Sequence, residues 1–182
     1  MKFVTTEIQG VILIDPVVYC DERGYFCETF QAKIFSEAGI PTHFVQDNQS
    51  GSCRGVLRGL HYQIHQAQGK LVRVVAGEVY DVAVDLRKSS PTCGKWSGHI
   101  LSAENKRQLW VPPGFAHGFY VLSQWAEVLY KATDFYASGW ERTLLWNDPQ
   151  VNIAWPLKDG QLPIVSQKDS QGCSFEEAEF YE

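Results

Sequence analysis

A succession of short apolar runs, separated by Gly, Pro, Asp and Ser, constrains the fold of this chain more than any other feature of its sequence. Runs of strand length at near-regular spacing are typical of an antiparallel β-sandwich or barrel. Ten Phe, eight Tyr and six Trp against one Met also favour strands over a helical bundle. We therefore expect an all-β fold. The runs span residues 10–14, 24–30, 44–46, 55–64, 70–76, 79–86, 96–101, 108–111, 118–122 and 126–132.

Three segments carry more specific expectations. Apolar residues recur at helical spacing over 30–38, and Gly39 and Pro41 then end the predicted helix. Residues 76–78, Ala-Gly-Glu, lie between two β-rich runs and predict a hairpin turn. Near the C-terminus, we expect the apolar stretch 162–165 to pack back onto the body.

Length, charge and cysteine usage bound the class of protein. The 182 residues contain no repeat, low-complexity tract or linker, and predict a single domain, 1–182. A formal charge of −5 gives no whole-chain reason to expect nucleic acid or an anionic membrane as a partner. No stretch reaches the roughly 18 apolar residues of a membrane span, and residues 1–7 lack the apolar region of a signal peptide. The five cysteines form no C-x-x-C pair, which indicates a reduced, cytoplasmic protein.

Two histidines are the leading candidates for chemistry. His61 lies within 55–63, and a histidine in the middle of a barrel strand can point into the interior, where burial and a carboxylate set its basicity. Arg58 and Lys70 lie near it in the sequence. His117 ends a Pro-x-Gly-x-x-His pattern, a turn that can deliver a histidine to the mouth of a barrel. A structural, hydrogen-bonded histidine is the competing interpretation for each.

The same histidines leave a metal site open as an alternative. Small β-barrels hold metals through histidines and a carboxylate, and residues four apart on a regular strand face the same side. The compact His-x-His pair followed closely by Glu is missing, however, and Gln63, a poor ligand, stands where the second histidine would be. The candidate ligands are His61, His65 and His117 with Glu78 or Glu104.

Several other polar residues have a surface interpretation when each is taken singly. Tyr130 is typical of a half-buried tyrosine on a strand, with its hydroxyl group in contact with solvent. Asp169 lies in a short polar segment, from which an aspartate can orient a histidine elsewhere in the chain. Arg suits bidentate phosphate binding, Lys acts as a point charge, and an amide-rich stretch suits a base or sugar. The residues that fit these last roles are Arg23, Glu28, Arg58, Lys70, Lys168 and 46–48.

A set of motifs in fixed order covers nearly the whole chain, from about residue 8 to residue 172. On these motifs the chain resembles the dTDP-4-dehydrorhamnose 3,5-epimerase family. No dinucleotide fingerprint of the form G-x-G-x-x-G accompanies them. The motifs are 21–26 (DERGYF), 44–48 (FVQDN), 55–63 (GVLRGLHYQ), 68–73 (QGKLVR), 77–87 (GEVYDVAVDLR), 112–119 (P-x-GFAHGF) and 130–131 (YK).

The resemblance implies a cupin-type jelly roll, with one or two short helices, that acts as a homodimer without metal or other cofactor. It implies the substrate dTDP-4-dehydro-6-deoxy-D-glucose, epimerised at C3 and C5 to dTDP-4-dehydro-L-rhamnose on the route to dTDP-rhamnose. Three alternatives stay open. These are a single-carbon (C3 or C5) epimerase of an antibiotic-type deoxysugar pathway, a metal-dependent cupin enzyme, and a non-catalytic sugar-nucleotide-binding cupin.

Carried over by position, the resemblance also assigns roles. His61 matches the base and Asp169 the carboxylate paired with it. Tyr130 matches the acid and Lys70 the cation near the C4 oxygen. This allocation suits proton transfer beside a ketone, because a cation stabilises the enolate while base and acid work on opposite faces. The ligand-contact positions are Arg23, Glu28, Gln46, Asp47, Asn48, Arg58, His117, Glu141 and Lys168, with Phe26 and Tyr136 as aromatic neighbours of the nucleotide base.

Two features depart from a simple carry-over. The connection 64–67 (Ile-His-Gln-Ala) lacks the expected proline and is slightly short, which leaves the reach of Lys70 and the role of His65 open. Arg58 and His61 have opposite parity, so on a regular strand they would face opposite sides. A β-bulge, or a site shared between two subunits, would reconcile them.

Overall fold

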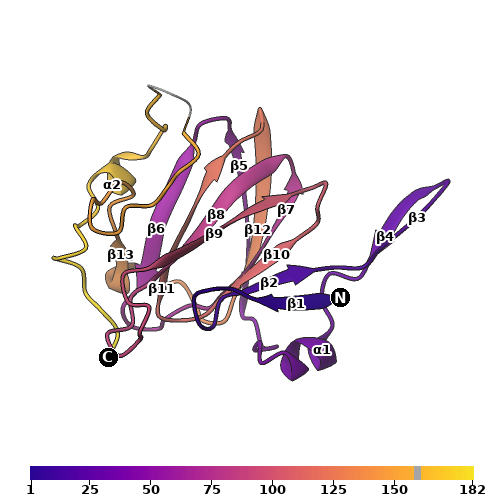
Figure 1. Cartoon of the computed structure of the whole chain (residues 1–182), viewed down its shortest axis with the longest axis horizontal. Helices are drawn as coiled ribbons and strands as arrows, with labels where there is room; N and C mark the ends of the chain where they lie inside the picture. The colour runs from indigo at the N-terminus through magenta and orange to yellow at the C-terminus, as the bar shows by residue number, and fades with distance from the viewer. Residues whose placement is uncertain (158–160) are drawn as a thin grey trace.

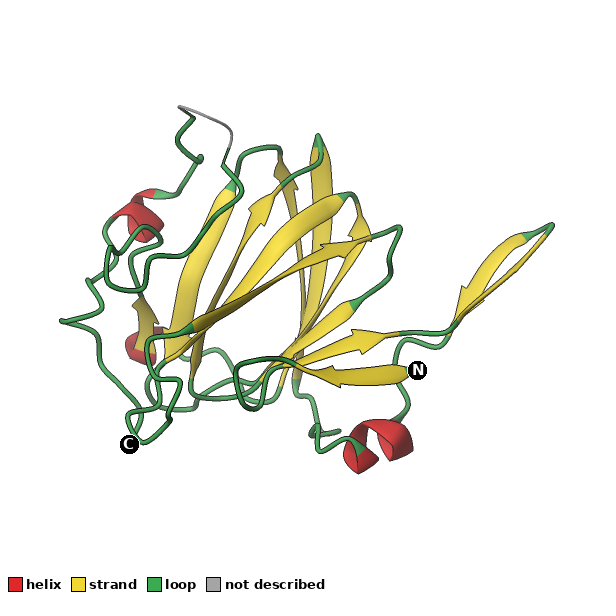
Figure 2. Cartoon of the chain, viewed as in Figure 1, coloured by secondary structure: helices red, strands yellow, loops and turns green. Residues whose placement is uncertain are grey.

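The structure is a computed structural model that describes residues 1–157 and 161–182. Two antiparallel sheets lie face to face and make up most of the molecule (Figure 1 and Figure 2), as the sequence predicts. The six-stranded sheet has the order β1 (Lys2–Thr5), β2 (Ile12–Asp15), β10 (Gln108–Val111), β7 (Lys70–Ala76), β12 (Trp125–Ala132), β5 (Gln46–Cys53). The five-stranded sheet has the order β13 (Glu141–Thr143), β6 (Leu57–Gln63), β11 (Phe115–Val121), β8 (Glu78–Asp85), β9 (Trp96–Ser102).

The main core lies between the two sheets, because alternate strand residues face the same side. Val72, Leu109 and Val128 reach it from the six-stranded sheet, and Val79 and Phe119 reach it from the five-stranded sheet. Each fully buried side chain of this size stabilises the fold by about 1.5–3 kcal/mol. A second cluster covers the outer face of the five-stranded sheet, where the C-terminal segment packs. The two sheets therefore enclose the interior of the molecule. A functional site is expected at the end of this interior that is lined by polar side chains.

The turn at 76–78 differs from the predicted hairpin. β7 ends at Ala76 and β8 begins at Glu78, but the two strands belong to different sheets. Gly77 has a φ of +71°, and a Cβ there would collide with the carbonyl oxygen of Trp125. A glycine between two apolar runs predicts a tight turn, yet it does not tell which sheet each strand joins. The position of the turn is confirmed, and the hairpin is wrong.

The helix predicted over 30–38 is confirmed as α1 (Ala32–Glu37). Phe35 is fully buried, and its ring centroid lies 4.8 Å from that of Phe30. Both belong to a cluster that packs on residues of β2, β7 and β10. Gly39, with a φ of +77°, follows the end of the helix. The helix thus covers part of the outer face of the six-stranded sheet.

β5 is a strand that the apolar pattern does not reveal. The sequence predicts only 44–46, whereas the strand runs through polar residues to Cys53. It pairs with β12 along its whole length, from the Gln46–Ala132 pair to the Cys53–Trp125 pair. Its less exposed residues alternate with exposed ones, as one face of a strand requires. The inner residues are Gln46, Asn48, Ser50 and Ser52.

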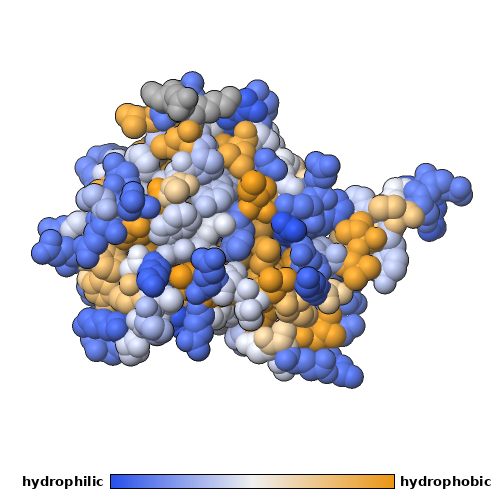
Figure 3. Space-filling model, viewed as in Figure 1, coloured by the Kyte–Doolittle hydropathy of each residue, from blue (hydrophilic) through white to orange (hydrophobic). Residues whose placement is uncertain are grey.

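A two-stranded arm, β3 (Val18–Asp21) and β4 (Gly24–Cys27), projects from the body (Figure 1) and stands clear of it in the space-filling view (Figure 3). Tyr25 is 63% exposed and Phe26 is 67% exposed. The ammonium of Lys106 lies 3.8 Å from the centroid of the Tyr25 ring, one contact between arm and body. An isolated hairpin is marginally stable in water, so exposed aromatic residues on it indicate a surface that binds another molecule.

The stretch 162–165 docks through its backbone. The N–H of Ile164 donates to the carbonyl oxygen of Gly55 at 2.8 Å, and its carbonyl accepts from the N–H of Leu57 at 2.9 Å. The side chain of Leu162 is 84% exposed and that of Ile164 is 59% exposed. The expected path of the chain is confirmed, but these two apolar side chains are not part of the core, because the backbone pairing turns them outward.

Two further observations concern the setting of the protein. Among the described residues, no helix is long and apolar enough to cross a membrane. All five cysteines lie in the described part of the chain, and each is free.

Candidate active site

His61 and Asp169 meet although 108 residues separate them. β6 carries His61 on its inner face, and α2 (Gln167–Ser170), which packs against β6, carries Asp169. Nε2 of His61 lies 2.6 Å from Oδ1 of Asp169. The histidine side chain is 30% exposed and the aspartate side chain 5% exposed. The fold therefore creates a largely buried contact between His61 and Asp169 that their spacing in the sequence does not reveal.

Asp169 is fixed by its own helix and by β6. Oγ of Ser166, the N-cap of α2, accepts the N–H of Asp169 at 3.1 Å. Oδ2 of Asp169 accepts the N–H of Gly59 at 3.3 Å. Burial alone would raise the pKa of Asp169, but its hydrogen bonds with His61, Gly59 and Ser166 hold that pKa below its usual value. The carboxylate is thus ionised at neutral pH and occupies Nε2 of His61, which leaves Nδ1 as the free ring nitrogen.

A β-bulge explains how Arg58 and His61 share a face. In the ladder between β6 and β11, His61 pairs with His117. Arg58 pairs with Phe119, so three steps along β6 match two along β11. The extra residue of a bulge reverses the parity of the strand. Gly59 lies in this segment with a φ of +113°, and a Cβ on it would come within 2.7 Å of the carbonyl oxygen of His117. Glycine therefore permits the close approach of the two strands.

Lys70 begins β7 in the facing sheet, at the same end of the interior. Its Nζ lies 3.5 Å from the carbonyl oxygen of His61. Burial lowers the pKa of Lys70 to about 8, while the carboxylates of Glu141 and Asp81 act in the opposite direction. The short connection 64–67 therefore does not keep Lys70 away from His61. A partly buried cation of this kind is suited to stabilise negative charge that develops on an oxygen.

Tyr130 lies on β12, in the wall opposite to β6. Its ring is partly buried and packs against the main core. Burial raises the pKa of Tyr130, Glu141 raises it further, and Arg58 acts against both. The phenol therefore keeps its proton at neutral pH and can serve as a proton donor.

Glu141, Lys168 and Tyr136 form a connected group beside the interior. Nζ of Lys168 lies 2.5 Å from Oε2 of Glu141, and the hydroxyl of Tyr136 donates to the same oxygen at 2.7 Å. Burial would raise the pKa of Glu141, but the contacts with Lys168 and Tyr136 lower it. Tyr136 is 55% exposed. The group offers an anion, a cation and an open aromatic ring, which together suit a nucleotide.

The inner face of β5 adds polar groups to the same end. Nε2 of Gln46 donates to Oδ1 of Asn48 at 2.9 Å, and Nε of Arg58 donates across the interior to Oγ of Ser52 at 2.9 Å. Nδ2 of Asn48 and Oγ of Ser50 are buried and have no hydrogen-bond partner in the described part of the chain. Since buried polar groups are normally hydrogen-bonded, this wall is suited to a polar ligand.

His117 has a partner that the sequence analysis missed. Its Nε2 lies 2.9 Å from Oδ1 of Asp81, and the two residues are 7% and 0% exposed. β8 brings Asp81 to the inner face, two residues from Ala83, which pairs with His117. The signal in the sequence was a pair of carboxylates, Asp81 and Asp85, inside the largely apolar run 79–86, because a buried charge needs a partner. His117 is thus held in place beside His61.

Arg23, Phe26 and Glu28 do not join this interior group within one chain. Arg23 lies at the turn of the arm, where its side chain is 85% exposed and its ion-pair partner is Asp21. Glu28 follows the arm, and its carboxylate accepts from the amide of Gln31 at 3.4 Å. The arm leads away from the body that holds the interior (Figure 1).

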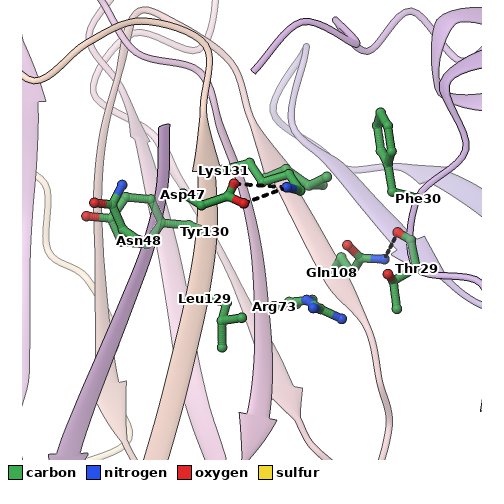
Figure 4. A pocket seen from close by; sticks show the side chains of 10 residues that line it. Thr29, Phe30, Asp47, Asn48, Arg73, Gln108, Leu129, Tyr130 and Lys131 are labelled. Carbon is green, nitrogen blue, oxygen red and sulfur yellow. Dashed lines mark hydrogen bonds and ion pairs between the residues drawn. The ribbon is translucent and has the colours of Figure 1, made fainter. Parts of the chain in front are cut away.

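Asp47 faces a separate hollow on the outer side of the six-stranded sheet (Figure 4). Its carboxylate oxygens accept from Nζ of Lys131 at 2.9 and 3.0 Å. Arg73 and Gln108 line the same hollow, which has a volume of about 90 Å³. The carboxylate of Asp47 is therefore directed away from His61 and the residues around it.

The candidate metal ligands predicted from the sequence do not all lie close together in the structure. His65 is exposed, and its ring centroid lies 4.5 Å from that of Trp140 at 87°. Glu78 lies at the turn between the sheets, where its N–H donates to Ser123, and Glu104 lies in the connection between β9 and β10. Among the described residues, no group of three or more His, Cys, Asp or Glu side chains is arranged to hold a metal ion.

Comparisons with known proteins agree with this fold. A family model described as dTDP-4-dehydrorhamnose 3,5-epimerase matches residues 5–177. The dTDP-4-dehydrorhamnose 3,5-epimerase of Pseudomonas aeruginosa is 59% identical over 100% of this chain and 99% of that protein. The crystal structure of dTDP-6-deoxy-D-glucose-3,5-epimerase from Legionella pneumophila, in complex with dTDP-4-keto-L-rhamnose, is 52% identical with a TM-score of 0.93, and the match covers 98% of this chain and 94% of that one. A 3'-monoepimerase from Streptomyces bikiniensis, in complex with dTDP-quinovose, is 33% identical with a TM-score of 0.87, covering 94% and 86%.

The jelly roll is of the cupin type, and its inner end holds a histidine paired with an aspartate, a lysine and a protonated tyrosine on facing walls. Fold and site together are those of a cupin-class enzyme whose interior is suited to acid–base chemistry. The chain belongs to the dTDP-4-dehydrorhamnose 3,5-epimerase family.

Proposed function

We propose that this chain epimerises dTDP-4-dehydro-6-deoxy-D-glucose at C3 and C5, giving dTDP-4-dehydro-L-rhamnose for the synthesis of dTDP-rhamnose. The observation that carries the proposal is the 2.6 Å contact between His61 and Asp169 on the inner wall. Together with Lys70 and Tyr130, it supplies the base, cation and acid that proton exchange beside a ketone requires. Family membership over residues 5–177 supports the substrate.

The first half of the reaction removes a proton from a carbon next to the C4 ketone. Nδ1 of His61 takes the proton, and the electron pair of the broken C–H bond moves into a carbon–carbon double bond. Negative charge then develops on the C4 oxygen, where the ammonium of Lys70 stabilises the enolate. Asp169 stabilises the imidazolium that forms.

The second half returns a proton to the opposite face of the same carbon. Tyr130 donates it, the double bond collapses, and the C4 oxygen becomes a ketone again. β6 and β12 belong to facing sheets, so His61 and Tyr130 approach the sugar from opposite sides, which inverts the centre. The same exchange at the second carbon completes the reaction, after both residues recover their protonation states through solvent.

The remaining polar groups bind the nucleotide and the sugar. Arg58 and Lys168 suit the diphosphate, the open ring of Tyr136 suits stacking on the base, and His117 suits a sugar hydroxyl. Amides of β5 supply further donors and acceptors. The proposed ligand contacts are Gln46, Asn48, Arg58, His117, Glu141 and Lys168 in the interior, with Arg23 and Glu28 on the arm; Asp47, which pairs with Lys131 in the outer hollow, is left out of this set.

The functional unit in this proposal is a homodimer in the cytoplasm. Each arm docks on the other copy, covers its aromatic residues Tyr25 and Phe26, and carries Arg23 and Glu28 to the other copy's site. The exposure of those aromatic residues on an otherwise isolated hairpin supports the dimer. The free state of all five cysteines supports the reducing compartment.

An epimerase that inverts a single carbon is the second candidate, since a related 3'-monoepimerase has the same fold. Identities of 59% and 52% with 3,5-epimerases, against 33% with the monoepimerase, favour inversion at both carbons.

Turnover of the substrate in deuterium oxide, followed by NMR, tests these readings. We expect deuterium at both C3 and C5. Label at one carbon would replace the proposal with the single-carbon enzyme, and binding without any label would favour a non-catalytic protein. Loss of labelling after a chelator, restored by added metal, would favour the metal-dependent alternative.

A further inference from the structure

Gln63 uses its side-chain amide to bind the backbone of two loops. Its Nε2 donates to the carbonyl oxygen of Gln66 at 2.7 Å and to that of Phe135 at 3.2 Å. Its Oε1 accepts the N–H of Ala137 at 2.9 Å. The residue is 4% exposed. Since a primary amide has two N–H donors, both are engaged, and neither is free for a substrate.

The two loops that Gln63 binds carry groups of the proposed site. Residues 64–69 lead from β6 to Lys70, the first residue of β7. Residues 133–140 lead from β12 to Glu141, the first residue of β13, and contain Tyr136. One buried side chain therefore joins the segment that delivers the cation to the segment that delivers the aromatic ring.

Tyr136 lies directly between the two anchored residues, Phe135 and Ala137. Its own N–H donates to Oε1 of Gln46 at 3.0 Å, and its hydroxyl donates to Glu141 at 2.7 Å. The ring is more than half exposed, so packing does little to orient it. The direction of the ring depends on these hydrogen bonds and on the backbone that Gln63 holds on either side.

We propose that Gln63 is a positioning residue that sets Tyr136 and Glu141 for the nucleotide half of the substrate. The inference rests on the proposed function and extends it to a residue that the metal alternative treats only as a missing ligand. Gln63 and His61 lie two apart on the inner face of β6. One strand thus carries the catalytic base and the anchor of the binding loop, and substitution can separate the two roles.

Gln63→Glu tests the proposal with little change in shape. A carboxylate cannot donate to the carbonyl oxygens of Gln66 and Phe135, and it sets acceptor against acceptor. We expect the Kd for dTDP, measured by calorimetry, and the KM for the dTDP-sugar to rise about tenfold. We expect kcat to stay within about twofold, because Lys70 and Tyr130 are held by strand pairing and His61 by Asp169, independently of the Gln63 side chain. An unchanged Kd for dTDP would overturn the proposal.

A double-mutant cycle with Tyr136→Ala distinguishes positioning from a general loss of structure. If Gln63 acts through the Tyr136 loop, Gln63→Glu weakens dTDP binding in the wild-type background and adds less than about twofold in the Tyr136→Ala background. Equal losses in both backgrounds would contradict that route. Should Gln63→Glu not fold, Gln63→Met, which removes the same hydrogen bonds with an apolar chain of similar length, is measured in the same cycle with the same criteria.

Asn105→Asp is the matched control. Nδ2 of Asn105 donates to the carbonyl oxygen of Ile100 at 3.0 Å, and its Oδ1 accepts from the N–H groups of Ser102 and Arg107, each at 3.0 Å. This substitution also replaces an amide that ties a turn together, but none of its partners belongs to the proposed site. It should lower the melting temperature and leave dTDP binding unchanged. A wild-type protein that fails to turn over the dTDP-sugar contradicts the proposed function; normal dTDP binding by the Gln63 variants of an active enzyme contradicts only the role of Gln63.

Discussion

The inner end of the jelly roll and the β3–β4 arm hold predicted site residues in opposite ways. In the interior, His61 and Asp169 come together from distant parts of the chain, and burial and hydrogen bonds fix both. On the arm, Arg23 is exposed, and its ion pair is with Asp21, two residues away. The groups proposed to transfer protons are complete within one chain, whereas some of the groups proposed to bind the ligand are not.

The physical reason is that proton transfer and phosphate binding place different demands on the side chains. A base and its carboxylate need a fixed geometry in a place of low dielectric, which only a packed interior provides. Charges that hold a phosphate can come from an exposed element, since ordering on binding is sufficient for them. We therefore expect interior substitutions to act on kcat and arm substitutions to act on KM.

The largest effect should come from His61→Asn, which removes the base and keeps a polar side chain. We expect kcat to fall about a thousandfold, with a normal circular dichroism spectrum and normal dTDP binding. The rate of deuterium incorporation into the substrate is the measurement. A variant that still exchanges within tenfold of the wild-type rate would remove His61 from the mechanism.

Lys70 should give the next largest effect and a distinctive pH dependence. Its pKa is lowered to about 8 by burial, so the cation is present below that pH and is lost as the pH rises through it. Activity should accordingly decline above about pH 8 in the wild type. Lys70→Met should lower kcat about a hundredfold at neutral pH. Lys70→Arg keeps its charge, so its alkaline decline should lie at higher pH. An identical alkaline limb in wild type and Lys70→Arg would contradict this assignment.

Mixing two variants with different defects tests the arm directly. Arg23→Ala alone should raise KM about tenfold with little change in kcat. In a mixed dimer of Arg23→Ala and His61→Asn subunits, one site combines an intact His61 with the intact arm of the other copy. Samples with co-expressed subunits should therefore recover sites with wild-type KM. If each arm serves its own chain, no such site forms, and KM stays high.

The smallest effect should come from Lys168→Met. The ammonium is about half exposed and pairs with Glu141, and exposed ion pairs contribute little. We expect KM to rise about threefold and kcat to stay constant. Steady-state kinetics at low and moderate salt checks this, and a large loss of kcat would move Lys168 from binding to chemistry.

Much of the fold could be predicted from the sequence, because apolar runs and their punctuation determine local structure. The run 79–86 is β8, and the helical spacing over 30–38 is α1. Most of β5 was not predicted because its inner face is polar. A strand that lines a site lacks the alternation of apolar residues by which strands are recognised in a sequence. The turn at Gly77 was located, but the pairing of the strands on either side depends on contacts far along the chain.

The site was predictable only through the family resemblance. Nothing in the spacing of His61 and Asp169 indicates their contact, since a short capped helix 108 residues away supplies it. The opposite parity of Arg58 and His61 left two explanations open, a β-bulge or a site shared between two subunits. The structure contains the bulge. Asp81 and Gln63 were missed as site residues because buried hydrogen-bond partners leave little trace in a single sequence.

A crystal structure of the enzyme with its dTDP-hexulose product tests most directly whether a base on β6 and an acid on β12 act across the sugar. The expected result has Nδ1 of His61 on one face of the ring, the hydroxyl of Tyr130 on the other, and Asp169 still bonded to Nε2. A sugar bound with both groups on the same face, or with the ring of His61 turned to solvent, would contradict the proposed proton transfer.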